Sequence, residues 1–430
     1  MMARAPRLGV IAVGWLAAAA GACIENPRPA TLQPEDTFSL GQGKLFVTYR
    51  SDDRVAIIDP ATLAVERLIQ VGADPFLIDG PHEAILGPDA ESYFVTVGEG
   101  PRAWGSSDGV MPPPDGGCPP DQPHCQHMGG SVPGAAERYR LADNAFLGRA
   151  EAGLGAAQIA ITPDGSKMYV TSFTTKLGQC GSVTVINPRT MTRIRRIEGL
   201  PTAPHGIAIT PDGSKVVVAT YWDHLVVINT ADDTWQEIAA GPAPAGRCEN
   251  VRTKYRPNTV AISPDGRRAY VTLALPSEVI ALDLTTTPPA LVPDFRPRTT
   301  GSPQQVAITA DSSTLVVACD GNHFVDVIDV ATKTVASVDI GRPSGQGSGV
   351  ADAFGLTVHP NGQLAYVAAG CGDYRGGGPG CSTPQGALVE IGLAKPPEVR
   401  RKIRLGAGVV HVTFGSPPPS PPTASGKDHP

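Results

Sequence analysis

Residues 204–230, PHGIAITPDGSKVVVATYWDHLVVINT, decide the fold of this chain. Two apolar runs, 206–210 and 216–220, flank the turn Pro211-Asp212-Gly213, and a third run follows at 225–229. The runs are short and rich in β-branched residues, which favours strands over helices. Because proline presets the φ angle of a type I turn and glycine tolerates its exit geometry, the first two runs are predicted to pair as a hairpin. A three-stranded unit of this kind cannot bury its faces alone.

The same unit recurs along the chain. From Asp164 onward the copies of the turn lie 46 to 53 residues apart, and an insertion widens the interval before it. Each turn stands between two apolar strands, and a third apolar strand and a fourth, less apolar one follow. The other copies of the turn are Pro88-Asp89-Ala90, Pro163-Asp164-Gly165, Pro264-Asp265-Gly266, Ala310-Asp311-Ser312 and Pro360-Asn361-Gly362. Four strands in a unit of this length are typical of a β-propeller blade.

The two ends of the repeat array complement each other. We call the strand before each turn the inner strand of its unit and the strand after the turn the second strand. The chain has seven second strands, and the first of them, LFVTY (45–49), has no inner strand before it. The last inner strand, GVVHVTFG (408–415), has no second strand after it. We therefore expect an all-β, seven-bladed β-propeller over residues 43–415, in which the C-terminal strand closes the ring by entering the first blade. Closure protects the sheet edges.

The strand sequences point to a family. YVT or YVA strands, such as AYVTL (269–273), follow the Pro-Asp-Gly turn, and the third strand continues as in VIDVAT (327–332). This pattern resembles the YVTN repeat family of seven-bladed propellers over nearly the whole mature chain. The resemblance implies the fold. It does not imply one function, because such propellers include binding proteins, lactonases and redox enzymes.

The N-terminus has the features of an export signal. Arg4 and Arg7 precede an apolar stretch, 8–20, that is short for a membrane span. It ends in Ala20-Gly21-Ala22-Cys23, which resembles the lipobox of bacterial lipoproteins, although that family prefers leucine where Ala20 stands. We predict a lipoprotein-type signal peptide at 1–22, lipidation of Cys23, a linker at 23–42 and a disordered Pro/Ser-rich tail at 416–430. Ordinary secretory cleavage is the alternative. The protein is expected to be exported and anchored by lipid in the bacterial cell envelope.

Charge and composition limit the partners. The net charge is −6, and no basic stripe indicates nucleic acid. An envelope protein or a small ligand remains as a partner, and a monomer is expected.

Polar residues recur where the inner strands begin. His82, His205, Asn258 and Gln304 each follow a proline at equivalent positions of four blades. Ring geometry should point them at one mouth of the central channel, where converging polar side chains would form a ligand site. The alternative is that they cap strand ends and bond to water or to neighbouring blades.

The loops on the same face carry further candidates. Long insertions lie at 98–132 and 370–385, and Asp223, His224 and His323 lie in shorter loops. Elaborated loops on a rigid ring often carry function, although neutral variation has the same appearance. A basic cluster precedes one inner strand and would either bind an anionic group or remain solvated; it consists of Arg247, Arg252, Lys254 and Arg256.

Seven cysteines remain after Cys23. In an exported protein such cysteines are expected to form disulfides. The predicted pairs are Cys118–Cys125, Cys371–Cys381 and Cys180–Cys248, which leaves Cys319 free and buried. A metal site at Cys118, His124, Cys125 and His127 is an alternative, but the spacing does not match a four-ligand zinc pattern. No cofactor motif is present in the sequence.

No catalytic motif stands out: H-E-x-x-H is missing from the sequence, and no G-x-S-x-G or phosphate-binding glycine loop stands in a strand-to-helix setting. We therefore expect a non-catalytic binding or scaffold module that acts through its loop-rich face. The alternatives are a lactonase-like or redox enzyme that uses His82 and His205, and a metal-binding propeller.

Overall fold

A computed structural model describes residues 38–50, 53–72, 80–98, 133–173, 180–242, 244, 246–248, 253–320, 323–341, 352–370, 386–406 and 408–417. The regular secondary structure of these residues is entirely strand. None of these residues forms a helix that is long and apolar enough to span a membrane.

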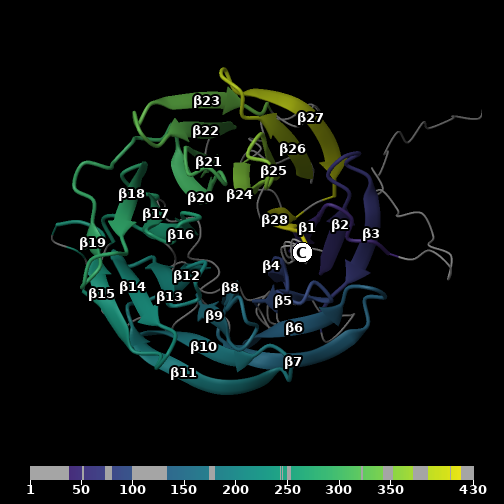
Figure 1. Cartoon of the computed structure of the whole chain (residues 1–430), viewed down its shortest axis with the longest axis horizontal. Helices are drawn as coiled ribbons and strands as arrows, with labels where there is room; N and C mark the ends of the chain where they lie inside the picture. Colours follow the sequence, from purple (N-terminus) through teal and green to yellow (C-terminus); the bar gives the residue numbers. More distant parts are fainter. Residues whose placement is uncertain are drawn as a thin grey trace, which may run out of the picture.

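The strands form seven four-stranded antiparallel sheets, which surround a central axis as the blades of a propeller (Figure 1). The first two blades are β28 (Val409–Gly415), β1 (Lys44–Tyr49), β2 (Arg54–Ile58), β3 (Val65–Gln70), and β4 (Pro81–Leu86), β5 (Ser92–Val97), β6 (Gly134–Arg140), β7 (Phe146–Gly153). The third and fourth are β8 (Ala156–Ile161), β9 (Met168–Ser172), β10 (Gly181–Asn187), β11 (Thr192–Leu200), and β12 (Pro204–Ile209), β13 (Lys215–Thr220), β14 (His224–Asn229), β15 (Trp235–Ala239). The fifth and sixth are β16 (Pro257–Ile262), β17 (Arg268–Leu273), β18 (Glu278–Asp283), β19 (Ala290–Leu291), and β20 (Ser302–Ile308), β21 (Thr314–Asp320), β22 (Phe324–Asp329), β23 (Val335–Asp339). The seventh is β24 (Asp352–Val358), β25 (Leu364–Gly370), β26 (Gly386–Gly392), β27 (Glu398–Leu405). The predicted fold class is confirmed.

The predicted hairpin is the inner half of the fourth blade. The amide of Gly213 donates to the carbonyl of Thr210 at 2.8 Å, which closes the turn. Gly213 has a φ of 72°, a conformation that suits glycine. A Cβ there would also lie 2.9 Å from Cδ of Pro163, in the equivalent turn of the third blade. The turns therefore nest against each other around the ring.

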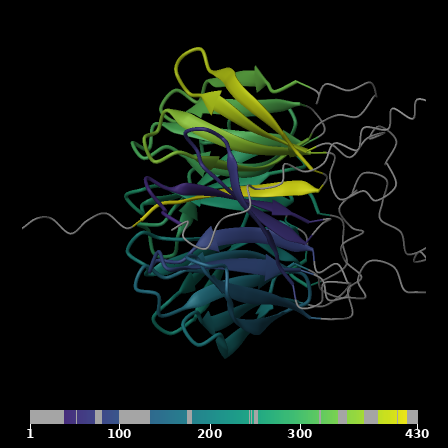
Figure 2. The same cartoon turned by 90° about the vertical axis from the view of Figure 1, so that its right-hand side faces the viewer.

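The ring closes as the repeat count predicts. Strand β28 pairs antiparallel with β1, with Leu45 opposite Phe414 and Val47 opposite Val412. Figure 2 shows this C-terminal strand (yellow) lying among the first strands of the chain (purple). The first blade is thus built from both ends of the propeller.

The hydrophobic core is divided among the gaps between blades. Seven buried clusters each combine side chains from two neighbouring blades. In β13, Val216 and Val218 pack toward the third blade, whereas Val217 and Ala219 pack toward the fifth. Because alternate residues of a strand point to opposite faces, both faces of the second strand are buried and its sequence is continuously apolar.

The outer strand of the fifth blade differs from the others. Strand β19 has only two residues, Ala290 and Leu291. Pro288 and Pro289 precede it, and proline cannot donate to the ladder, so pairing on this edge is short.

Candidate functional site

A threonine near the end of a second strand ties two inner strands together. Thr171 accepts a hydrogen bond from the amide of Gln158 at 3.1 Å and donates to the carbonyl of His205, in the next blade, at 2.7 Å. The register of β12 shifts between Pro204 and Ile207, so His205 lies where the strand leaves the ladder. Equivalent hydroxyl bonds to the next blade are made by Thr48, Thr96 and Thr272. The threonine of the YVT pattern therefore fixes the backbone beneath the axial side chains.

The four polar residues predicted at the axis come together. Nε2 of His82 lies 3.3 Å from Nε2 of His205, although these residues belong to the second and fourth blades. Nδ1 of His205 lies 3.2 Å from the carbonyl oxygen of Asn258, and Nδ2 of Asn258 donates to Oε1 of Gln304 at 2.5 Å. His205, Asn258 and Gln304 are buried and His82 is half-buried. We call these four residues the axial cluster.

A glycine permits the contact between His205 and the fifth blade. A Cβ on Gly206 would stand 2.4 Å from both the carbonyl oxygen of Asn258 and Cα of Thr259. Any larger residue would push β12 away from β16, and the imidazole of His205 would lose the carbonyl that orients it.

Two more side chains extend the axial cluster at the same end of the ring. The hydroxyl of Tyr221 donates to Oδ1 of Asn258 at 3.1 Å, and Nε2 of Gln304 donates to Oδ2 of Asp320 at 3.0 Å. Burial raises the pKa of Tyr221 to about 12, so its hydroxyl remains a donor at neutral pH. Aromatic rings of Phe173 and Tyr221 pack edge-on at 4.7 Å, and both pack against His205.

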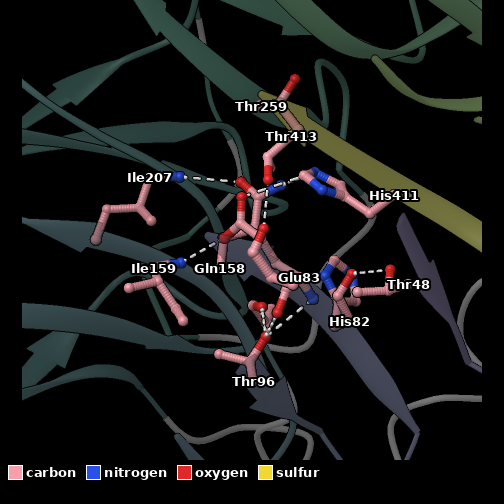
Figure 3. A network of polar contacts seen from close by, with 12 residues as sticks. Thr48, His82, Glu83, Thr96, Gln158, Ile159, Ile207, Thr259, His411 and Thr413 are labelled. Carbon is pink, nitrogen blue, oxygen red and sulfur yellow. Dashed lines mark hydrogen bonds and ion pairs between the residues drawn. The ribbon is translucent and has the colours of Figure 1, made fainter. Parts of the chain in front are cut away.

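A second axial layer lies one residue further along the inner strands, and we define it as Glu83, Gln158 and His411 (Figure 3). Oε2 of Glu83 accepts from the amide of Ile159 at 2.7 Å, and Oε1 of Gln158 accepts from the amide of Ile207 at 3.3 Å. Each side chain thus satisfies a backbone donor of the next blade. Nε2 of His411 lies 3.3 Å from Nε2 of Gln158 and 3.7 Å from Oε1 of Glu83.

Glu83 and His411 are neutral near pH 7. Burial raises the pKa of Glu83 to about 8, and the amide of Ile159 opposes this only in part. Burial also lowers the pKa of His411 to about 3, with a smaller electrostatic contribution from the neighbouring His205. Desolvation therefore outweighs mutual attraction, and the pair is no ion pair in spite of the short distance.

This second layer was not predicted from the sequence. Its signal was present, because Glu83 and Gln158 occupy the same position in two adjacent inner strands and His411 occupies it in the closing strand. An alignment of all seven inner strands, extended one residue beyond the proline-linked position, would have found it.

The three loop-face candidates have different surroundings. Asp223 is fully buried, and its carboxylate accepts backbone amides of Lys254 at 2.9 Å and Tyr255 at 2.7 Å. His224 is also buried, with Nδ1 2.6 Å from the carbonyl of Trp222 and Nε2 3.1 Å from Glu237. Asp223 therefore supports the loop that enters the fifth blade, whereas His224 is held by groups of its own, fourth blade. His323 is half-buried, with Nε2 3.8 Å from Asp339.

One predicted disulfide falls within the described residues and is confirmed. Cys180 and Cys248 are bonded, which ties a loop of the third blade to the connection between the fourth and fifth blades. Cys319 is a free, buried thiol, as predicted, and burial raises its pKa above the usual range. The other cysteine predictions lie outside the described residues; they concern Cys23, Cys118, Cys125, Cys371 and Cys381.

Metal-ligand clusters and cavities are considered for the described part of the chain. The described residues contain no group of three or more His, Cys, Asp or Glu side chains that is arranged to hold a metal ion. A cavity of about 290 Å³ lies away from the axis, between the fourth blade and residues 286–289 of the fifth. Lys215 and Ser214 line it beside the Pro-Asp-Gly turn, so it opens at the opposite end of the ring from the axial cluster.

Comparison with known proteins identifies the fold. No protein-family model matches the chain, and no curated protein sequence matches it. Solved structures do match. A functionally unknown protein from Desulfotomaculum acetoxidans is 15% identical, with a TM-score of 0.60 over 87% of this chain and 99% of that one. Periplasmic gluconolactonase from Pseudomonas aeruginosa is 16% identical, with a TM-score of 0.57 over 86% of this chain and 98% of that one. Hydrazine synthase from Kuenenia stuttgartiensis is 19% identical, with a TM-score of 0.52 over 76% of this chain and 80% of that one. At these identities the likeness is one of fold alone.

Proposed function

We propose that this protein is an exported propeller lipoprotein of the YVTN type, which acts in the bacterial cell envelope as a binding module through its loop-rich face. The repeat pattern supports the family, and the sequence around Cys23 supports the lipid anchor. The axial cluster carries the binding part of the proposal. Four polar side chains from four blades meet at the end of the ring where the inner strands begin and the loops between blades lie.

The axial cluster suits a small polar ligand. His82 is half-buried and Asp320 is partly exposed, so solvent reaches the hydrogen-bonded side chains of the axial cluster at these two residues. The threonine bonds described above hold the backbone in place, so little ordering is needed on binding, and preorganised donors and acceptors favour affinity.

Recovery of a ligand tests the proposal. The full chain is purified from its own envelope under native conditions, and bound small molecules are detected by native mass spectrometry. We expect wild type to retain a ligand and the Asn258→Ala variant to lose it. Lys215→Ala, at the opposite end of the ring, is the matched control and should retain it. Retention by Asn258→Ala, or no ligand and no envelope partner for wild type, would contradict the proposal.

A second candidate function is hydrolysis of a lactone. The paired imidazoles of His82 and His205 could accept a proton from water, and a periplasmic gluconolactonase shares the fold. Turnover of a lactone panel by wild type, lost in His205→Ala and kept in Lys215→Ala, would favour this candidate over the binding module.

A further inference from the structure

Arg256 is a buried cation that no carboxylate of the described residues neutralises. The residue is 7% exposed, and no acidic group of the described part of the chain lies within ion-pair distance of its guanidinium. Its Nη2 lies 3.5 Å from the hydroxyl of Ser302. Its Nε is buried and has no hydrogen-bond partner among the described residues. Within the described part of the basic cluster, Arg256 is thus buried and not solvated.

The backbone of Arg256 is held firmly at this place. Its amide donates to Oδ1 of Asp223 and to the hydroxyl of Thr253, both at 3.2 Å. Its carbonyl accepts from the amide of Ala274 at 3.0 Å. Asp223 also accepts the amides of Lys254 and Tyr255, so it fixes the turn that carries Arg256 into β16.

The guanidinium faces the axial cluster. Its Cζ lies 5.8 Å from the ring centroid of Tyr221, whose hydroxyl bonds to Asn258. A cation–π contact near the 6 Å limit is weak and does not compensate for a buried charge. An anion bound beside the guanidinium of Arg256 would compensate for the buried charge, because it would pair with that charge and accept a hydrogen bond from Nε.

Resting on the proposed function, we propose that the ligand of the axial cluster carries a carboxylate, which pairs with Arg256 while its polar remainder bonds to Tyr221, Asn258 and Gln304. A monoanion fits better than a phosphate. Asp320 bonds to Gln304 and brings a negative charge to the same end of the ring, so a doubly charged group would be repelled.

Matched pairs of acids and amides test the inference on the full chain. Calorimetry measures binding of acetate, lactate and succinate against acetamide, lactamide and succinamide, which have the same shape without charge. We expect at least one acid to bind and its amide not to bind. In Arg256→Gln the affinity should fall about 10- to 100-fold, the usual loss for a charged hydrogen bond. Arg298→Gln is the control, since its side chain is 83% exposed and its removal changes the net charge equally.

Unliganded stability gives a second readout. Because an unneutralised buried cation destabilises the fold, Arg256→Gln without ligand should unfold at the same temperature as wild type or above it. A lower midpoint would mean that Arg256 is structurally paired, which overturns the inference. Equal binding of acids and amides, equal affinity of Arg256→Gln and wild type, or binding of none of the acids would also overturn it. These results leave the proposed function intact if native mass spectrometry still finds a ligand in wild type that the Asn258→Ala variant loses. If no such ligand is found, the proposed function is contradicted together with the inference.

Discussion

The imidazoles of His82 and His205 meet edge-on, with their Nε2 atoms 3.3 Å apart and an interplanar angle of 82°. The backbone decides which ring donates. Nδ1 of His205 faces the carbonyl of Asn258, which can only accept, so this nitrogen carries the proton. In the neutral ring Nε2 of His205 is then an acceptor, and the proton between the two histidines belongs to His82.

The first prediction concerns these tautomers. In ¹⁵N-labelled protein, long-range ¹H–¹⁵N spectra should show His205 protonated at Nδ1 and His82 protonated at Nε2. Replacing His82 by Phe should leave the His205 tautomer unchanged, because Asn258 sets it. Protonation of His205 at Nε2 in wild type would refute the assignment.

The second prediction is a pH dependence of stability that originates in Glu83. Its pKa is raised from 4.5 to about 8, so its contribution to stability is full below pH 4.5 and is lost as the pH rises through 8. Glu83→Gln does not titrate and keeps an oxygen for the amide of Ile159. From pH 4.5 to pH 8 the variant should gain about 1 to 4 kcal/mol relative to wild type in urea unfolding. Glu91→Gln, in an exposed turn, should show no such gain.

His411 is expected to make stability depend on pH in the opposite direction, with a loss of stability in acid. Its pKa is lowered from 6.5 to about 3, so its contribution is full above pH 6.5 and is lost as the pH falls toward 3. The His411→Gln variant should therefore lose less stability than wild type over this acid range. Parallel curves for variant and wild type would mean that His411 is solvated in the folded protein.

The third prediction concerns the threonine that joins two blades. Thr171→Val keeps the shape but leaves the amide of Gln158 and the carbonyl of His205 without their buried partner. The free energy of unfolding should fall by about 1 to 3 kcal/mol. Thr192→Val, at an exposed position of β11, is the control and should change it by less than about 0.5 kcal/mol. Equal effects of the two substitutions would contradict the inter-blade role.

The fourth prediction concerns the disulfide. It closes a segment of 68 residues, so its removal in a Cys180→Ser, Cys248→Ser double variant should cost about 2 to 5 kcal/mol of stability. Denaturant unfolding of the oxidised wild type, the variant and the reduced wild type measures this. The variant and the reduced wild type should agree; a variant as stable as the oxidised protein would show that blade packing alone holds the connection.

The fold was accessible from sequence because its signals are local and repeated. Each second strand is buried on both faces and is therefore a continuous apolar run, and each Pro-Asp-Gly turn marks where it begins. The axial cluster could be predicted for a related reason, since a proline precedes each member at an equivalent position of the ring. Asp223 and His224 were expected at the loop face because sequence does not tell that Asp223 accepts the amides of the next connection and that His224 is buried against Trp222 and Glu237. Arg256 appeared in the sequence as one of four basic residues, and only the structure shows that its side chain is buried.

The pairing of β28 with β1 determines when, during synthesis, the propeller can complete its folding. The strand that completes the first blade is the last of the described propeller strands in chain order, so no product that ends before it can form this closed ring. Until Val412 reaches Val47, the first blade exposes an open edge and the seventh lacks one of its neighbours. Folding of the whole propeller is therefore conditional on the arrival of one strand, and a prematurely terminated chain would remain open and vulnerable to proteolysis.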